Sequence, residues 1–267
     1  MCLNQMSTDR RYALPMLPVT PPGAGVGLHE WVLGHLGAAV AAGEIPEGTI
    51  LRIEELEARY EVSRTVAREA VKVLESMSLL ESRRRVGIRV LPRARWNVYD
   101  PRLIRWRLDG PGRMDQLMSI SQLRRGLEPL AARLAALHAT EEQARALSSA
   151  AAGMAMTARI PDLLAYLEYD ILFHETLLQA SGNEMLVALA PVVREVLAGR
   201  THHHLMPEHP ENEAVRLHGR IATAVANGDA DTAESAMRTV VDEAQTAMVQ
   251  IAADEDAGSV DGRARCL

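Results

Sequence analysis

The spacing of apolar residues predicts helices over most of the chain. Residues 28–42 carry apolar side chains on one helical face, and Gly43 is placed to end that helix. A second helix is predicted over residues 53–60. A third begins after Ser63, whose hydroxyl can accept a hydrogen bond from a free amide of the first turn. Two short helices joined this way, after a longer first helix, indicate a helix-turn-helix. The expected buried face of the third helix consists of Val66, Ala70, Val73 and Leu74.

Two short β-prone segments follow the third helix. They cover residues 79–82 and 86–90 and flank a basic turn at residues 83–85. Such a wing can contact phosphates or the minor groove. A helix that enters the major groove needs an apolar back and cationic or small hydroxyl residues at its N-terminal front. The residues at that front are Arg64, Thr65 and Arg68.

The remainder of the pattern is helical, so we expect a mainly α protein with a small β wing. Breaks near residues 140, 153, 160–161, 182–183, 207–210 and 227–229 predict six or seven helices in an antiparallel bundle. The expected segments are a flexible arm (1–25), a winged helix-turn-helix domain (26–93), a linker with a short helix (94–114), a helical domain (115–252) and a disordered tail (253–267). Trp96 and Trp106 can pack the short helix of the linker onto one of the two domains.

Composition excludes several classes of protein. No run of about 18 uncharged apolar residues indicates a membrane span, and the N-terminus lacks a secretion signal. The two cysteines, Cys2 and Cys266, lie in the expected arm and tail, so no disulfide framework follows and a reducing cytoplasm is the expected setting.

Charge is distributed unevenly along the chain. The net charge of −6 argues against a nucleic-acid partner. However, residues 83–107 contain nine arginines and one acid, whereas residues 115–256 contain ten arginines and twenty-one acids. This asymmetry favours a phosphate-facing segment attached to a separate acidic domain.

Polar residues interrupt the apolar stripes of the helical domain. Arg124 lies on the inward face of its helix, where an arginine usually pairs with a carboxylate of a ligand or of the protein, such as Glu128. Asp170 and His174 share one buried stripe one turn apart, which suits two ligands of one metal. His218 lies on the apolar face of a later helix. A lone histidine of this kind is more typical of a satisfied core residue, whereas three convergent groups favour a metal site.

The N-terminal motifs resemble the winged helix of the GntR family of bacterial transcription regulators. The segments that carry the resemblance read G-E-I-P-E-G-T, V-S-R-T-V-A-R-E-A-V-K-V-L and R-R-V-G-I-R-V. The resemblance implies that the arginines of the second segment contact DNA and that the wing glycine lets the backbone approach it. Glu54 stands where family members often carry an arginine, so we expect more phosphate contacts from residues 83–85. The predicted DNA-binding residues are Ser63, Arg64, Thr65, Arg68, Arg85 and Gly87.

The helical domain resembles the FCD effector domain of the FadR-type branch of this family. D-I-L-F-H at residues 170–174 matches the D-x-x-F-H segment of that domain, and L-R-R-G-L-E-P-L-A-A-R-L-A-A matches its opening helix. The resemblance implies a divalent metal, expected to be zinc, on Asp170, His174 and His218. The fourth family ligand position falls on Val240, which predicts a weaker metal or an open position for water or effector. A substitute ligand from His202, His203 or His204 is possible, although a surface cluster is the more typical interpretation.

These features predict a homodimeric transcription regulator, a repressor by default, that binds palindromic double-stranded DNA. The expected effector is a small carboxylate held by Arg124. The R-W-N-x-x-D-P-x-x-I-x-W junction resembles galactonate- and gluconate-responsive members, which implies a sugar acid. One alternative is a metal-dependent hydrolase on the same three ligands with an appended DNA-binding domain, although no glutamate is positioned as its general base. The other is a DNA-binding module whose helical domain serves only for dimerisation.

Overall fold

The computed structural model describes residues 27–159, 162–206 and 212–264. The expected arm over residues 1–25 lies outside these ranges. The chain divides into two compact units, with the boundary between Arg113 and Met114. No helix in the described ranges is long and apolar enough to cross a membrane.

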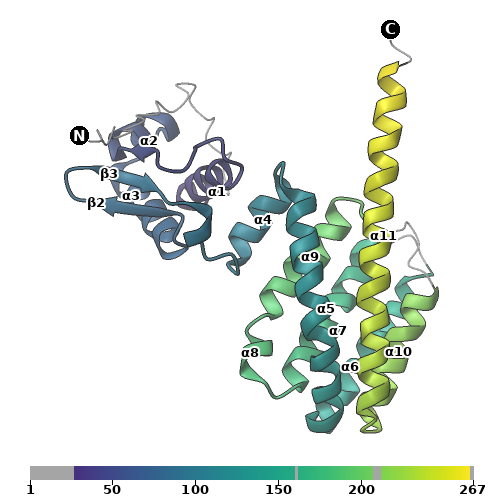
Figure 1. Ribbon diagram of the computed structural model, residues 1–267. Helices are drawn as coiled ribbons and strands as arrows, with labels where there is room; N and C mark the ends of the chain where they lie inside the picture. Colours follow the sequence, from purple (N-terminus) through teal and green to yellow (C-terminus); the bar gives the residue numbers. More distant parts are fainter. Residues whose placement is uncertain (1–26, 160–161, 207–211, 265–267) are drawn as a thin grey trace, which may run out of the picture. The chain divides into compact units, whose positions relative to one another are not determined.

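The first unit is a winged helix-turn-helix (Figure 1). Its helices are α1 (Leu28–Ala41), α2 (Ile53–Tyr60), α3 (Arg64–Ser76) and α4 (Pro101–Asp109), with a short 3₁₀ turn at Arg93–Arg95. Its strands are β1 (Ile50–Leu51), β2 (Leu80–Arg83) and β3 (Gly87–Val90). They form an antiparallel sheet in the order β1-β3-β2, in which Arg83 pairs with Gly87 at the tip of the wing. The predicted helix-turn-helix and wing are therefore confirmed.

Helix α3 begins as expected, with its buried face slightly rotated from the prediction. The Ser63 hydroxyl accepts a hydrogen bond of 3.4 Å from the Val66 amide. The buried residues are Ala67, Ala70, Val71 and Leu74, whereas Val66 and Val73 are only partly buried. The predicted and the observed faces share Ala70 and Leu74. The face packed in the core instead uses two alanines, whose small side chains permit close approach of neighbouring helices.

The segment expected to be a linker packs into the first unit. Trp96 donates a hydrogen bond of 2.9 Å from Nε1 to the Leu91 carbonyl, and both Trp96 and Trp106 pack against the core that α1 and α3 share. Gly37 of α1 leaves room for Trp106, because a Cβ there would overlap the indole ring. Helix α4 is thereby fixed to α1 through a glycine-sized notch.

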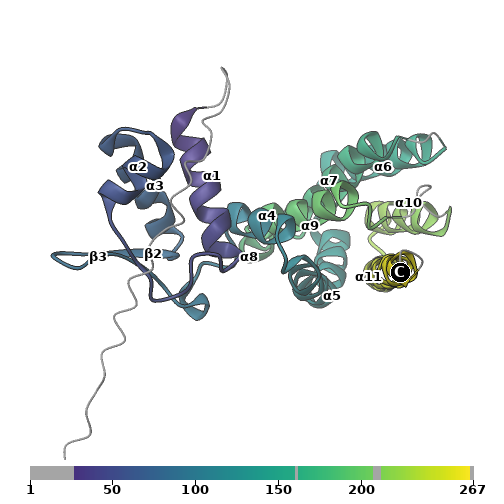
Figure 2. The same cartoon turned by 90° about the horizontal axis from the view of Figure 1, so that it is seen from above.

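The second unit is an all-helical bundle (Figures 1 and 2). Its helices are α5 (Arg113–His138), α6 (Glu141–Thr157), α7 (Leu163–Ala180), α8 (Glu184–Val187), α9 (Ala190–His202), α10 (Asn212–Ala226) and α11 (Ala230–Ala264). Helix α11 continues beyond residue 252, where a tail was expected. The expected breaks at 160–161 and 207–210 fall on residues outside the described ranges.

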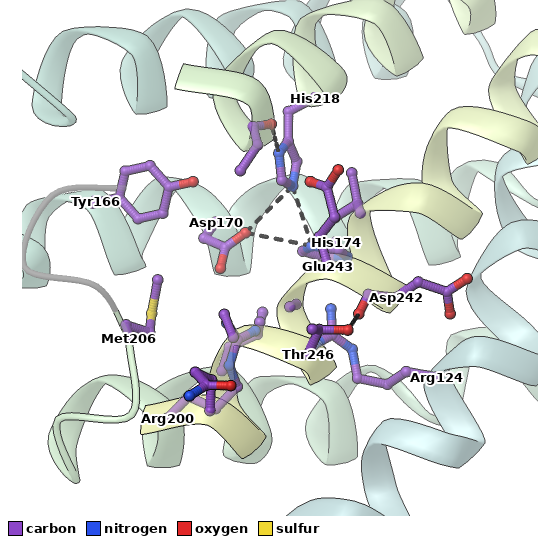
Figure 3. Close-up of a pocket in the computed structure, with 16 residues that line it drawn as sticks. Arg124, Tyr166, Asp170, His174, Arg200, Met206, His218, Asp242, Glu243 and Thr246 are labelled. Carbon is purple, nitrogen blue, oxygen red and sulfur yellow. Dashed lines mark hydrogen bonds and ion pairs between the residues drawn. The ribbon is translucent and has the colours of Figure 1, made fainter. Parts of the chain in front are cut away.

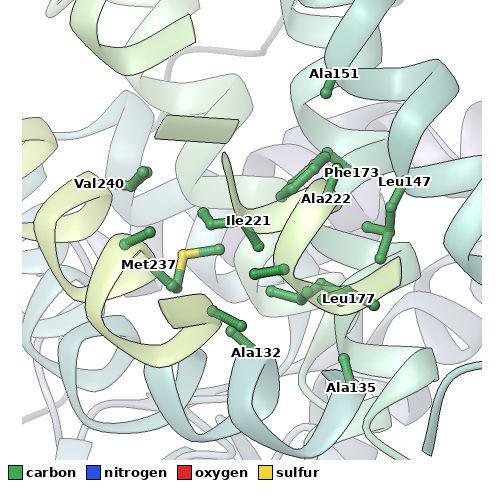
Figure 4. Packing of buried hydrophobic residues seen from close by; sticks show 14 of the residues in the cluster. Ala132, Ala135, Leu147, Ala151, Phe173, Leu177, Ile221, Ala222, Met237 and Val240 are labelled. Atoms are coloured by element: carbon green, nitrogen blue, oxygen red, sulfur yellow. The ribbon is translucent and has the colours of Figure 1, made fainter. Parts of the chain in front are cut away.

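The expected break at Gly153 is wrong, since α6 runs through it. A Cβ at residue 153 would overlap the ring of Tyr169, so this glycine allows α7 to pack closely on α6. The core of the bundle is built from alanines and a few larger residues, with Phe173, Leu177, Ile221 and Met237 near its centre (Figure 4). Close helix packing brings the inward polar residues of α5, α7 and α10 into contact.

Gly37→Ala should destabilise the first unit by about 1–3 kcal/mol, because the added methyl displaces Trp106 from its notch. Gly34→Ala on the same helix meets nothing within 4 Å and should stabilise the unit by up to about 1 kcal/mol. All three tryptophans, Trp31, Trp96 and Trp106, lie in this unit, so urea unfolding followed by tryptophan fluorescence reports on it selectively. Equal midpoints for the two variants would contradict the packing argument.

Candidate functional site

A groove of about 690 Å³ lies between α3 and the wing. Arg64, Thr65 and Arg68 are exposed at the start of α3, as predicted. Arg85 occupies the turn between β2 and β3 with a φ of +67°. The basic residues that line the groove are Arg52, Arg64, Arg68, Lys72, Arg83, Arg84 and Arg85. This concentration of cations suits a surface that faces phosphates.

Gly87 has a structural role that the sequence did not reveal. Its φ is +123°, and a Cβ at this position would lie 2.8 Å from the Leu51 carbonyl oxygen. Glycine is therefore required where β3 leaves the tip of the wing and passes β1.

Glu54 forms an ion pair with a predicted DNA-contacting residue. Its Oε1 lies 3.0 Å from Nη1 of Arg64, and Oε2 of Glu57 lies 3.9 Å from the same nitrogen. The acid that replaces the expected arginine on α2 thus holds Arg64 at the edge of the groove. Both side chains are half-exposed, so the pair itself contributes little to stability.

Asp170, His174 and His218 converge in the second unit as predicted (Figure 3). The Nε2 atom of His174 lies 3.3 Å from Oδ1 of Asp170 and 3.5 Å from Nε2 of His218. The third side of this triangle, from His218 Nε2 to Asp170 Oδ1, is 3.6 Å. Ligand atoms around a tetrahedral zinc are separated by about 3.3–3.6 Å, given bonds of about 2.0–2.2 Å. The three residues therefore fit a divalent metal without rearrangement.

In both histidines, the Nδ1 atom, which points away from the cluster, lies close to an oxygen atom of the protein. His174 Nδ1 lies 3.0 Å from Oε2 of Glu128, and His218 Nδ1 lies 2.7 Å from the Ala214 carbonyl oxygen. A carboxylate or carbonyl in this position keeps the proton on Nδ1 and directs the lone pair of Nε2 toward the metal. Glu128 is thus placed to orient the His174 ring in the candidate metal site, through an ion pair rather than a hydrogen bond.

The charges in this cluster are strongly coupled. Burial alone would lower the pKa of His174, but Glu128 and Asp170 raise it to about 9. Burial lowers the pKa of His218 to about 4 despite the nearby Asp170. Burial would raise the pKa of Glu128, yet Arg124 and His174 hold it at about 2. Of the two rings, the metal-free protein therefore keeps His174 as the cation.

Arg124 is paired within the protein. Its Nε and Nη2 atoms donate hydrogen bonds of 2.7 and 3.1 Å to the two oxygens of Glu128. The internal partner considered from the sequence is therefore present, although Arg124 still lines the cavity beside the metal ligands. Val240 also lines this cavity and offers no ligand atom. Among the described residues, the histidines at 202–204 do not join the ligand cluster.

The cavity has a volume of about 540 Å³, within the range of small-molecule sites. Sequence reasoning missed two of its buried polar residues, Tyr166 and Arg200. Arg200 follows Val193, Val196 and Leu197 at helical spacing, so its inward position was detectable from the same stripe argument that identified Arg124.

Comparison with known proteins agrees with both units. The family described as bacterial regulatory proteins, gntR family, matches residues 28–90, and the FCD domain family matches residues 119–243. The HTH-type transcriptional regulator YieP of Escherichia coli K12 is 31% identical over 209 residues, which cover 77% of this chain and 89% of YieP. The galactonate operon transcriptional repressor of the same organism is 29% identical over 208 residues, which cover 77% of this chain and 90% of that protein.

A solved structure of Lar from Listeria monocytogenes shares the fold, with a TM-score of 0.52 at 16% identity over 85% of this chain and 99% of that chain. The chain belongs to the GntR family of bacterial transcription regulators and carries an FCD domain. It is a DNA-binding, effector-responsive regulator. The alternative of a metal-dependent hydrolase is therefore wrong.

Glu128→Gln should weaken zinc binding by about 10- to 100-fold, because it removes the charge that orients His174. Competition with a chromophoric chelator measures this affinity. Glu175→Gln is the matched control, since Glu175 pairs with Arg194 at the surface of the same unit. Unchanged zinc affinity in Glu128→Gln would remove Glu128 from the metal centre.

Proposed function

We propose that this protein is a dimeric repressor of a catabolic operon and that a sugar acid releases it from palindromic DNA. The observation that carries the proposal is the arrangement in the second unit. Three ligand atoms spaced for one metal open onto a cavity that two buried arginines, Arg124 and Arg200, also line. Cations and a metal around one cavity favour a carboxylate ligand that also carries hydroxyl groups.

The proposed metal is zinc, held by Asp170, His174 and His218. When bound, it would act as a Lewis acid that attracts oxygen atoms of the effector. With Val240 in place of the fourth family ligand, one position stays open to the effector or to water. Arg124, which Glu128 fixes in place, contributes positive charge to the same cavity.

The proposed DNA interface is the groove between α3 and the wing. Arg64, Thr65 and Arg68 would enter the major groove, while Arg85 and the backbone at Gly87 contact the sugar-phosphate chain. Ser63 supports them by capping α3. One such helix covers too few base pairs for useful specificity, so two copies acting on two half-sites are proposed.

We propose that the effector controls DNA binding by shifting the equilibrium between two arrangements of the dimer. The ligand binds more tightly to the dimer arrangement in which the two winged helices fit the half-sites less well, and it can shift the equilibrium only by that difference in affinity. The relative that represses a galactonate operon supports galactonate as the first effector to test. The cavity argues against a purely dimerising helical domain, which would need no charged interior.

Arg68→Ala should weaken operator binding by about 1–3 kcal/mol if its guanidinium contacts a base edge. Gel shifts on DNA upstream of this gene and its neighbours measure the midpoint. Arg145→Ala is the control, because Arg145 is an exposed residue of the second unit. An unchanged midpoint for Arg68→Ala would exclude it from base contact.

His174→Ala should abolish release by D-galactonate or D-gluconate and leave operator binding intact, since it removes a metal ligand and no DNA contact. The same gel shift, with and without each acid, provides the measurement. Release that persists in the variant would show that the metal centre is not the effector site. Absence of release by any sugar acid in the wild type would contradict the effector class.

A further inference from the structure

Arg200 of α9 is a buried cation with an unsatisfied donor. Its side chain is 6% exposed and lines the cavity that holds Asp170, His174 and His218. Among the described residues, its Nε atom has no hydrogen-bond partner. Figure 3 shows Arg200 on the side of the cavity away from His218. A buried guanidinium nitrogen without an acceptor is costly, so its retention at a cavity wall points to a ligand.

Two other arginines of this unit, Arg124 and Arg194, have a structural role, because each pairs with a carboxylate of the protein. Buried Arg124 donates from two nitrogens to Glu128. On the same helix as Arg200, the half-exposed Arg194 donates from two nitrogens to Glu175. In the described part of the chain, no carboxylate forms an equivalent bidentate pair with Arg200. Arg200 is therefore set apart from the arginines that hold the bundle together.

Electrostatics inside the cavity also favour an anion beside Arg200. Burial lowers the pKa of Arg200 to about 10, and the positive charge of Arg124 acts in the same direction. The guanidinium remains charged at neutral pH, so two cations repel each other across a region of low dielectric. The carboxylates of Asp170 and Glu128 partly offset this repulsion. An incoming carboxylate would relieve it and supply the acceptor that Nε lacks.

We propose that Arg200 binds the carboxylate group of the effector, across the cavity from the metal ligands, and so selects acids over neutral sugars. The proposal rests on the proposed function, which places a sugar acid in this cavity. Arg124 then acts through its charge and through Glu128, whereas Arg200 makes the direct contact. Tyr166, which is buried beside Arg200 and Asp170, is available to hydrogen-bond the hydroxyl groups of the ligand.

Calorimetry on the zinc-loaded full chain tests the proposal, with D-galactonate as the probe and D-galactose as its neutral analogue. Arg200→Gln should weaken D-galactonate binding by about 10- to 100-fold, the range expected for a lost charge-assisted hydrogen bond. Zinc affinity, measured by chelator competition, should change far less than D-galactonate affinity, because Asp170, His174 and His218 make their ion pairs with one another and with Glu128. Arg194→Gln is the matched control: Arg194 lies six residues before Arg200 on α9, is half-exposed, and its variant should bind the acid as wild type does.

Two different results separate failure of this inference from failure of the proposed function. Wild-type protein that binds no D-galactonate contradicts the effector, whatever the variant does. Wild-type protein that binds D-galactonate equally well after Arg200→Gln overturns the role of Arg200. Arg200→Lys keeps the charge and loses the planar fork, so it should bind the acid less tightly than wild type and more tightly than Arg200→Gln.

The melting temperature of the ligand-free protein gives a readout that needs no effector. If Arg200 is kept for a ligand, Arg200→Gln should melt within about 2–4 °C of wild type or above it, since it removes a buried charge without breaking an ion pair. A larger decrease would show that Arg200 supports the fold and would overturn the proposal.

Discussion

The stability of the second unit depends on pairing the charged side chains that its close helix packing buries away from water. Arg124 and Glu128 are almost fully buried one helical turn apart, and each would be costly without the other. The second oxygen of Glu128 also faces His174, whose far nitrogen faces Asp170 and His218. These alternating charges join α5 to α7, and the neutral His218 ring connects them to α10. We therefore expect a change at any of these residues to alter both the packing of the bundle and the candidate metal site.

The same network of charges gives the cavity of the second unit an uneven polarity. Asp170 on its wall already pairs with His174, whereas the Nε atom of Arg200 has no hydrogen-bond partner among the described residues. On α11, Val240 presents an apolar surface where the family places another ligand. The cavity thus has one side suited to metal and another suited to an anion. A ligand that reaches both sides would hold α7, α9 and α10 together.

Much of this organisation could be predicted from the sequence, because helical spacing determines which residues point inward. That rule located Asp170, His174 and His218 on facing stripes and identified Glu128 as a partner of Arg124. Spacing could not tell which inward arginine is paired within the protein and which is not, since Arg200 lies on a stripe as apolar as that of Arg124. It also misread Gly153 as a break, because the ring of Tyr169 that requires a glycine comes from another helix. Contacts between distant segments were the information that spacing lacked.

The ion pair between Glu54 and Arg64 has a consequence for how the protein distinguishes its operator from bulk DNA. Arg64 already holds an oxyanion in the free protein, so the DNA contact we propose for it exchanges one acceptor for another. Such an exchange releases fewer counterions than the capture of phosphate by a solvated arginine. Affinity for arbitrary sequences is therefore reduced and depends less steeply on salt. Binding to the operator then depends more on contacts with base edges. Glu54 competes for Arg64 with a phosphate, and it does not replace these base contacts.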